Sequence, residues 1–283
     1  MKAIRIEEHG GPEAMRLVDI DTPEPGAGQI RIRHEAIGVN FIDTYHRTGL
    51  YPNALPHGLG LEAAGIVDAV GAGVTRFKVG DHAGYCGGPI GAYAEYSLVQ
   101  DARAVHVPQG ISFDLAAASM LKGMTARYLL RKTFRVERGH AVVIHAAAGG
   151  VGQIAVQWAK HLGATVIATV GSDAKAEIAK RLGADHVILT AREDIAKRVR
   201  EITGGGGAHV VYDGVGKDTW DASLDSLRPL GLMVTYGNAS GPVPPISPLL
   251  LSQKGSLFLT RPTLFTTRRR QSSWTKPPPI CSR

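Results

Sequence analysis

The sequence predicts an α/β fold with two domains, a small β-barrel followed by a doubly wound parallel sheet. With 283 residues, the chain exceeds the usual length of one domain. Residues 1–122 consist of short alternating runs separated by turns, whereas strand and helix patterns alternate from residue 123 onward. We therefore expect a barrel domain over 1–122, a parallel-sheet domain over 123–265 and a separate tail over 266–283.

Short strands with period-two alternation predict the barrel. Apolar and polar residues alternate over 3–6 and 29–33, and 65–71 is a further run of strand length. Clusters of glycine and proline, such as 23–26, separate these runs, which is typical of compact barrels. The apolar spacing of 116–131 then predicts a helix that leads into the second domain.

The second half of the chain has the pattern of repeated βαβ units. Apolar, β-branched runs alternate with segments in which apolar residues recur at helical spacing, which predicts a parallel sheet with helices on both faces. The expected strands are 141–146, 165–170, 186–189, 209–213, 231–236 and 256–260, and the expected helices are 151–162, 173–182, 193–202 and 218–228.

The first strand-to-helix junction of this domain carries a phosphate-binding pattern. Ala147, Gly149 and Gly152 fit G-x-G-x-x-G with alanine in the first place. Glycines allow the backbone to approach a pyrophosphate at the N-terminus of helix 151–162. A tight turn without a ligand is the alternative, which the complete βαβ context disfavours. We predict a dinucleotide site at this turn.

The end of the second strand indicates which dinucleotide binds. In NAD sites an acidic side chain at this place binds the ribose 2′-hydroxyl. Here the strand ends at Val170 and Gly171 without a carboxylate, and Asp173 is placed to cap the next helix. Ser172 and Lys175 offer a hydroxyl and an ammonium to a 2′-phosphate. These features favour NADPH, with a merely solvated Lys175 as the alternative.

Composition and charge disfavour several other classes of protein. No run approaches about 18 apolar residues and the N-terminus lacks an apolar segment, so we expect no membrane span, no signal peptide and a cytoplasmic location. The two cysteines give neither a disulfide framework nor a zinc cluster. Five of the seven net positive charges lie in 266–283, a tail that we expect to be disordered. A nucleic-acid partner is therefore not expected.

Several motifs in one order identify a family. They are 40–45 (Asn-Phe-Ile-Asp-Thr-Tyr), 49–52 (Gly-Leu-Tyr-Pro), 60–65 (Gly-Leu-Glu-Ala-Ala-Gly), 121–125 (Leu-Lys-Gly-Met-Thr), 146–152 and 236–238 (Tyr-Gly-Asn). From Met1 to about Leu264 the chain resembles the zinc-free NADPH:quinone oxidoreductases, the zeta-crystallin-like branch of the medium-chain dehydrogenase/reductase superfamily. The resemblance implies a GroES-like barrel, a Rossmann domain, NADPH as the cofactor and a quinone as the substrate.

The resemblance also bears on a metal site. Zinc alcohol dehydrogenases of this superfamily use an early cysteine and a Gly-His-Glu motif, because zinc prefers thiolate and imidazole ligands. The corresponding stretches here read Gly38-Val39-Asn40 and Gly60-Leu61-Glu62, and leucine cannot ligate a metal. We predict no metal, and we expect Glu62 to be a buried, hydrogen-bonded acid.

Carried over residue by residue, the resemblance implies two sets of site residues. Asn40 and Tyr45 would hydrogen-bond the quinone oxygen or the nicotinamide, and Tyr51 would lie beside them; ordinary half-buried packing is the alternative for each tyrosine. Thr190 stands where relatives often carry a tyrosine near the adenosine phosphate. The predicted cofactor-binding residues are Lys122, Thr125, Gly149, Gly150, Val151, Gly171, Ser172, Lys175 and Asn238.

Three alternatives to quinone reduction stay open. A double-bond reductase for conjugated enals or enones would use the same cofactor but deliver a proton to carbon. A non-catalytic, RNA-binding relative is disfavoured by the small net charge outside the tail. The third alternative is a damaged chain, because the family pattern ends at Leu264 and a reading-frame shift after it would leave the barrel incomplete.

The resemblance further implies a homodimer through an edge strand, for which 256–260 is suitable.

Overall fold

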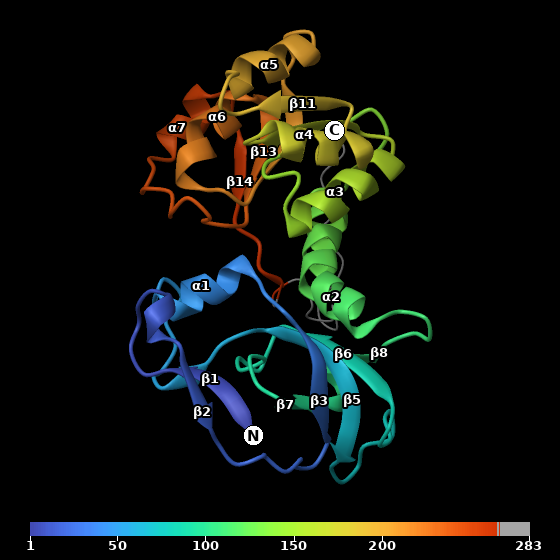
Figure 1. The fold of residues 1–283 in the computed structure, drawn as a ribbon. Coiled ribbons are helices and arrows are strands. Elements are labelled where there is room, and N and C mark those ends of the chain that lie inside the picture. Colours follow the sequence, from blue (N-terminus) through green and yellow to red (C-terminus); the bar gives the residue numbers. More distant parts are fainter. Residues whose placement is uncertain (265, 267–283) are drawn as a thin grey trace, which may run out of the picture.

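The computed structural model describes residues 1–264 and 266, and they form two lobes (Figure 1). The lower lobe in Figure 1 holds the N-terminal strands, and the upper lobe holds the later succession of strands and helices. Helix α2 (Phe113–Tyr128) and the segment after strand β14 (Phe258–Thr260) run between them. The predicted tail lies outside the described residues, apart from Thr266.

The N-terminal lobe contains two antiparallel sheets. On strand Gln29–Gly38, alternate residues such as Ile30 and Ile32 are buried against Tyr85 and Phe77, as the period-two pattern predicts. The larger sheet has the order β7 (Tyr96–Gln100), β3 (Gln29–Gly38), β5 (Glu62–Val70), β6 (His82–Cys86) and β8 (Ala104–His106), and the smaller has the order β2 (Arg16–Asp19), β1 (Lys2–Ile6) and β4 (His57–Gly58). The short helices of this lobe are α1 (Phe41–Arg47), η1 (Pro12–Ala14) and η2 (Asp101–Arg103).

The second lobe is built on a six-stranded parallel sheet. Its strands, in spatial order, are β11 (His186–Leu189), β10 (Thr165–Val170), β9 (Ala141–Ile144), β12 (Ala208–Asp213), β13 (Leu227–Thr235) and β14. Its helices are α3 (Gly150–His161), α4 (Asp173–Arg181), α5 (Ile195–Ile202), α6 (Trp220–Asp225) and α7 (Leu249–Gln253), with short turns η3 (Leu129–Thr133) and η4 (Lys217–Thr219). The predicted α/β class with a parallel sheet is confirmed.

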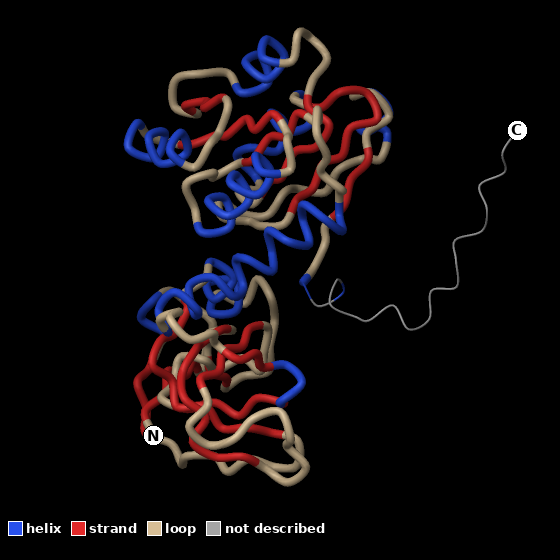
Figure 2. The backbone as a smooth tube through the Cα atoms, turned by 90° about the vertical axis from the view of Figure 1, so that its right-hand side faces the viewer, coloured by secondary structure: helices blue, strands red, loops and turns tan. Residues whose placement is uncertain are grey.

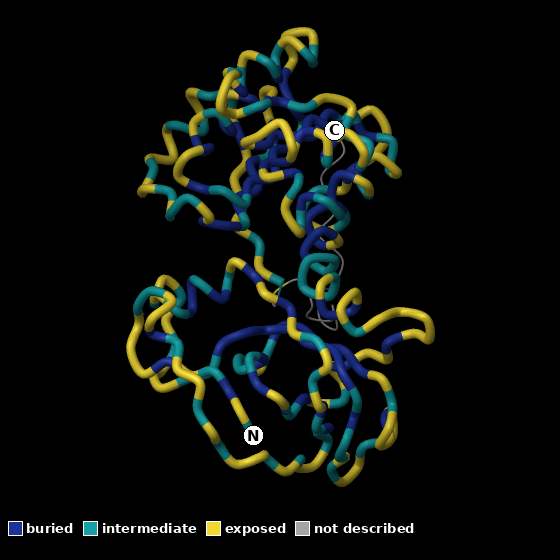
Figure 3. The backbone as a smooth tube through the Cα atoms, in the orientation of Figure 1, coloured by how far each residue is buried: buried dark blue, intermediate teal, exposed yellow. Residues whose placement is uncertain are grey.

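Both faces of this sheet are covered by helices, as Figure 2 shows from the side. Val142 and Ile144 of β9 pack in a cluster with residues of α2, α3 and α4. Val143, between them, packs on the other face with residues of α5 and α6. Strand β9 is therefore buried along its whole length and its neighbours β10 and β12 are buried at all but one position, and Figure 3 shows the inside of this lobe coloured mostly as buried. This explains why their sequences read as continuous apolar runs.

Several predicted boundaries are shifted: the strands predicted at 141–146, 231–236 and 256–260 are Ala141–Ile144, Leu227–Thr235 and Phe258–Thr260, and a helix end and a helix cap also differ. The predicted helix 218–228 ends at Asp225, and the chain enters β13 at Leu227. Pro229 explains the early end, because it disfavours helical backbone at the preceding residue and cannot donate a hydrogen bond. Asp173 was expected to cap α4, but Ser172 is the N-cap and Asp173 is the first helical residue.

The predicted domain boundary between residues 122 and 123 falls inside α2, so one helix belongs to the junction of both lobes. Ser112 caps it by accepting a hydrogen bond from the Leu115 N–H at 3.2 Å. In the described part of the chain, no helix is both long and apolar enough to cross a membrane.

Candidate active site

The turn between β9 and α3 presents backbone donors. Gly149 is the N-cap of α3, and the N–H groups in the first turn of a helix have no partner within it, so those of Gly150 and Val151 are available to an anion. A Cβ on Gly152 would lie 2.4 Å from the carbonyl oxygen of Ala146. Only glycine permits this close packing of helix against turn, as the sequence pattern predicted.

A cavity of about 460 Å³ lies at this turn. Three of the predicted cofactor residues, Gly149, Gly171 and Lys175, line it together with Thr190. The remaining lining residues are Ala146, Ala148, Thr169, Val170, Ile195, Val215, Asp218 and Thr219. A Cβ on Gly171 would meet only the Thr190 hydroxyl, at 4.0 Å, so its backbone faces open space. Backbone N–H groups, hydroxyls and the Lys175 ammonium thus meet in a space that suits an anionic ligand, with Asp218 as the one acidic residue of the lining.

Charged groups at the end of β10 favour a phosphate. The Ser172 hydroxyl accepts the Lys175 N–H at 3.4 Å and keeps its own proton for donation. The carboxylate of Asp173 pairs with the Arg192 guanidinium at 2.7 Å. The nearest carboxylate after the strand is therefore neutralised, while the exposed Lys175 ammonium lines the cavity.

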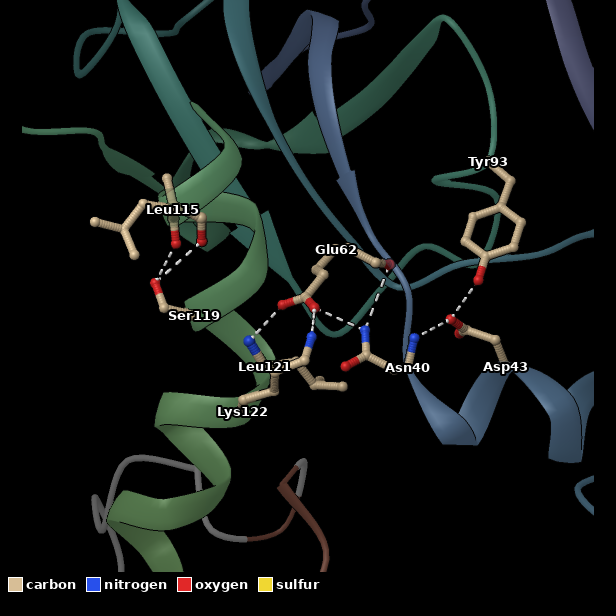
Figure 4. Close-up of polar contacts among 10 residues, drawn as sticks. Asn40, Asp43, Glu62, Tyr93, Leu115, Ser119, Leu121 and Lys122 are labelled. Carbon is tan, nitrogen blue, oxygen red and sulfur yellow. Dashed lines mark hydrogen bonds and ion pairs between the residues drawn. The ribbon is translucent and has the colours of Figure 1, made fainter. Parts of the chain in front are cut away.

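Glu62 connects the linking helix α2 to the barrel (Figure 4). Its side chain is fully buried, and its Oε1 accepts from Asn40 Nδ2 at 2.7 Å and from Lys122 Nζ at 2.8 Å. Its Oε2 accepts from the Leu121 N–H at 2.6 Å. The prediction that Glu62 is a buried, hydrogen-bonded acid is confirmed. Within the described residues, no group of three or more His, Cys, Asp and Glu side chains is arranged to hold a metal ion.

The hydrogen bond between Asn40 and Glu62 determines which atom of the Asn40 side chain is available to a ligand. Because a carboxylate only accepts, Asn40 must turn its amide nitrogen toward Glu62, which leaves its amide oxygen as an acceptor. Its backbone N–H donates to Asp43 Oδ2 at 2.9 Å, and the Tyr93 hydroxyl donates to the same oxygen at 2.8 Å. Burial raises the pKa of Asp43. Two buried carboxylates therefore fix the backbone and the side chain of Asn40.

Tyr45 and Tyr51 lie at the junction of the lobes. The Tyr45 hydroxyl accepts the Asn238 N–H at 2.6 Å, and the Tyr51 hydroxyl accepts from Arg261 Nη2 at 3.0 Å. Their rings pack edge to face with centroids 5.2 Å apart. Each hydroxyl accepts one hydrogen bond here and retains its proton for donation. Burial raises the pKa of Tyr45, which keeps that proton in place at neutral pH.

Arg261 is a residue that the sequence reasoning missed. Besides Tyr51, its guanidinium donates to Thr235 Oγ1 at 2.8 Å and to the Gly237 carbonyl at 3.1 Å. The signal was a basic residue directly after β14, at the carboxyl edge where ligands bind in parallel sheets. Thr125, which was predicted, is buried in α2.

The predicted residues therefore form two groups. Gly149, Gly171 and Lys175 line the cavity. The others lie outside its lining: Asn40 and Lys122 both donate to Glu62, Tyr45 accepts from Asn238, and Tyr51 accepts from Arg261. Gly150, Val151, Ser172 and Thr125 do not line the cavity either.

Comparison with known proteins identifies the family. Residues 26–109 match the alcohol dehydrogenase GroES-like domain, and residues 150–276 match the zinc-binding dehydrogenase family. The quinone oxidoreductase of Pseudomonas aeruginosa is 53% identical over 264 residues, which cover 93% of this chain and 81% of that protein. The 2-haloacrylate reductase of a Burkholderia species is 49% identical, over 92% of this chain and 80% of its own length.

Solved structures give the same result. The Escherichia coli quinone oxidoreductase complexed with NADPH superposes with a TM-score of 0.92 at 49% identity, covering 94% of this chain and 82% of that chain. The Pseudomonas syringae quinone oxidoreductase also gives a TM-score of 0.92, at 53% identity and the same coverage of both chains. This chain belongs to the quinone oxidoreductase family of the medium-chain dehydrogenase/reductase superfamily.

Proposed function

We propose that this chain is an NADPH-dependent quinone reductase. The observation that carries the proposal is the position of the Tyr45 and Tyr51 hydroxyls, which keep donatable protons where the barrel meets the dinucleotide lobe. Relatives at about half identity are quinone oxidoreductases, and a superposable relative was solved with NADPH. The cytoplasmic location and the domain bounds 1–122 and 123–265 remain part of this proposal.

The chain's own residues would hold the cofactor by its phosphates. The backbone at Gly149, Gly150 and Val151 suits the pyrophosphate, and Gly171, Ser172 and Lys175 suit the 2′-phosphate. The Asn40 amide oxygen suits a donor such as the carboxamide of nicotinamide, and Lys122 meets Asn40 on the same Glu62 oxygen. Thr125 and Asn238 complete the proposed set of cofactor-binding residues. When bound, the cofactor supplies a hydride from nicotinamide C4.

The two tyrosines would act on the acceptor. When a quinone accepts a hydride it becomes a hydroquinone anion, and hydroxyl donors fixed in advance stabilise the negative charge that develops on its oxygen. Tyr45 is oriented by the Asn238 backbone and Tyr51 by Arg261, so neither has to reorganise. The anionic oxygen of the hydroquinone anion can then take a proton from a hydroxyl or from water, which completes the two-electron reduction.

Double-bond reduction is a second candidate, because a 2-haloacrylate reductase is 49% identical to this chain. Such a reaction needs a proton at carbon, which a tyrosine hydroxyl can also deliver. The test is NADPH oxidation by the purified full chain with 1,4-benzoquinone and with a short 2-alkenal. Quinone reductase activity predicts a higher kcat/KM for benzoquinone; a higher value for the alkenal would favour the second candidate.

We also infer a homodimer through the edge strand β14. Among the residues that the structure describes, this strand pairs with β13 alone, and its Phe258 is 59% exposed. An open apolar edge of this kind pairs readily with a second copy. Light scattering after size exclusion should give twice the chain mass, and Phe258→Lys should shift the protein to a monomer. A monomeric wild type would contradict the inference.

A further inference from the structure

A chain of buried polar side chains lies beneath the dinucleotide cavity. His145 Nδ1 is 2.8 Å from Thr169 Oγ1, and its Nε2 is 2.9 Å from Ser223 Oγ. Ser223 Oγ donates to Asp213 Oδ2 at 2.8 Å, and Thr219 Oγ1 donates to the same oxygen at 2.8 Å. His145, Asp213 and Ser223 have no exposed surface. Four segments distant in sequence thus meet in one hydrogen-bond network.

The direction of each hydrogen bond follows from Asp213. An ionised carboxylate only accepts, so the single proton of Ser223 points to Asp213, and Ser223 must accept from His145. His145 is then protonated on Nε2, and its Nδ1 accepts from the Thr169 hydroxyl. Burial lowers the pKa of His145, in agreement with this neutral ring. Each hydrogen bond from Thr169 through His145 and Ser223 to Asp213 therefore has a defined donor and acceptor, and Asp213 Oδ2 accepts from both Ser223 and Thr219.

The network touches the lining of the cavity on both sides. Thr169 and Thr219 line the cavity themselves. Ala146, which follows His145 directly, begins the phosphate turn. On the other side, Asp213 Oδ1 accepts the Val215 N–H at 2.8 Å and the Gly216 N–H at 2.9 Å, which fixes the loop in which Val215 lines the cavity.

We propose that Thr169, His145, Ser223 and Asp213 form a positioning relay that sets the distance between the two walls of the dinucleotide cavity. Apolar side chains would fill this buried space without the desolvation cost of polar groups, so packing alone does not account for four polar side chains here. A polar chain instead prescribes where each connected segment must lie. The segments connected here are the ends of β9, β10 and β12 and helix α6.

The inference rests on the proposed function, so NADPH binding to the wild type is measured first, by fluorescence titration of the full chain. Ser223→Ala breaks the relay at its centre. We expect the Kd of NADPH to rise roughly tenfold. We expect the KM of NADPH to rise in parallel, without a proportional loss of kcat, because the groups proposed to face the quinone lie outside the network.

The matched control is Ser226→Ala. Ser226 lies at the end of the same helix and is equally buried, but its hydroxyl donates only to the Ala222 carbonyl, at 2.6 Å. Loss of the Ser226 hydroxyl should leave the Kd of NADPH within about twofold of the wild-type value. A Ser223→Ala protein that is folded and binds NADPH as tightly as the Ser226→Ala protein would overturn the proposal.

A second pair of variants keeps the test decisive if Ser223→Ala does not fold. Thr169→Val removes the hydroxyl at the other end of the relay with little change of shape, and Thr169→Ser retains it. We expect weaker NADPH binding for the valine variant and recovery for the serine variant. Equal Kd values for the two would overturn the relay. A wild type that does not bind NADPH would contradict the proposed function itself.

Discussion

The dinucleotide cavity and the junction of the lobes differ in how the sequence builds them. The phosphate turn is made by residues close in sequence, with Gly149 as the N-cap of α3 after strand β9 and Gly150 and Gly152 in the first turn of that helix. At the junction, Tyr45 meets Asn238 across 193 residues of sequence, and Tyr51 meets Arg261 across 210. The first is fixed by local backbone geometry, whereas the second exists only when both lobes are folded and docked. Changes at the two places should therefore have different effects.

Gly152→Val should give the largest effect and should eliminate NADPH binding. A Cβ would lie 2.4 Å from the Ala146 carbonyl and 2.7 Å from Ala147 Cα, so the helix must move away from the turn. Titration with NADPH measures the loss, which we expect to exceed roughly 100-fold. Gly206→Ala is the control, because its nearest contact would be an ordinary 3.4 Å. Tight NADPH binding by Gly152→Val would show that the turn is not built by close packing.

Lys122→Met should destabilise the junction. It removes one of the three donors to the fully buried Glu62 and leaves that carboxylate without its cation, which costs about 3 kcal/mol. Urea unfolding measures the difference in unfolding free energy between the variant and the wild type. Lys180→Met is the matched control, because its pair with Glu177 is 59% and 63% exposed, so water screens it and its loss should change the unfolding free energy little. Equal losses of unfolding free energy in the two variants would show that the buried Glu62 does not depend on Lys122 for its stability.

Tyr45→Phe should separate catalysis from cofactor binding. The variant removes the hydroxyl proposed to face the quinone but leaves the cavity unchanged. We expect kcat with benzoquinone to fall roughly tenfold, equivalent to about 1.4 kcal/mol, with the Kd of NADPH within about twofold. Phe41→Leu, a change at an exposed ring in contact with Tyr45, is the control. A larger effect on Kd than on kcat would place Tyr45 with the cofactor.

Acidification should weaken the fold through its buried histidines. Burial lowers the pKa of His145, so the folded chain favours the neutral ring. Stability is then fully present above the unfolded pKa of about 6.5 and is lost as the pH falls toward the lower folded pKa. His34, His46 and His209 act in the same direction, because burial lowers their pKa values too.

The measurement is the unfolding free energy at about pH 7.5 and at about pH 5.5. His145→Asn should lose less stability between the two pH values than the wild type, by about 1 kcal/mol. His161→Asn, at the exposed end of α3, is the control and should keep the wild-type pH dependence. An unchanged pH dependence in His145→Asn would show that this ring does not resist protonation.

The features that the sequence predicts are those built by residues close together in the chain, and the features that it does not predict join distant residues. The phosphate pattern, the helix after it and the apolar strands lie close to their predicted positions, because periodicity and glycine placement act over a few residues. Glu62 was predicted to be buried, since leucine replaces the zinc ligand beside it. Arg261 and the relay through His145 and Ser223 were not predicted, because their partners lie on distant strands whose spatial order no local pattern specifies. Ser172 in place of Asp173 as the helix cap is a difference of one residue, which propensity cannot resolve.

The most direct test of the central claim is a fluorescence titration of the purified full chain with NADPH and with NADH, repeated on Lys175→Met. The claim is that the cavity binds NADPH and recognises its 2′-phosphate through the Lys175 ammonium. We predict that the wild type binds NADPH at least roughly tenfold more tightly than NADH, and that most of this preference is lost in the variant. Equal affinity of the wild type for the two cofactors, or a preference that Lys175→Met leaves unchanged, would contradict it.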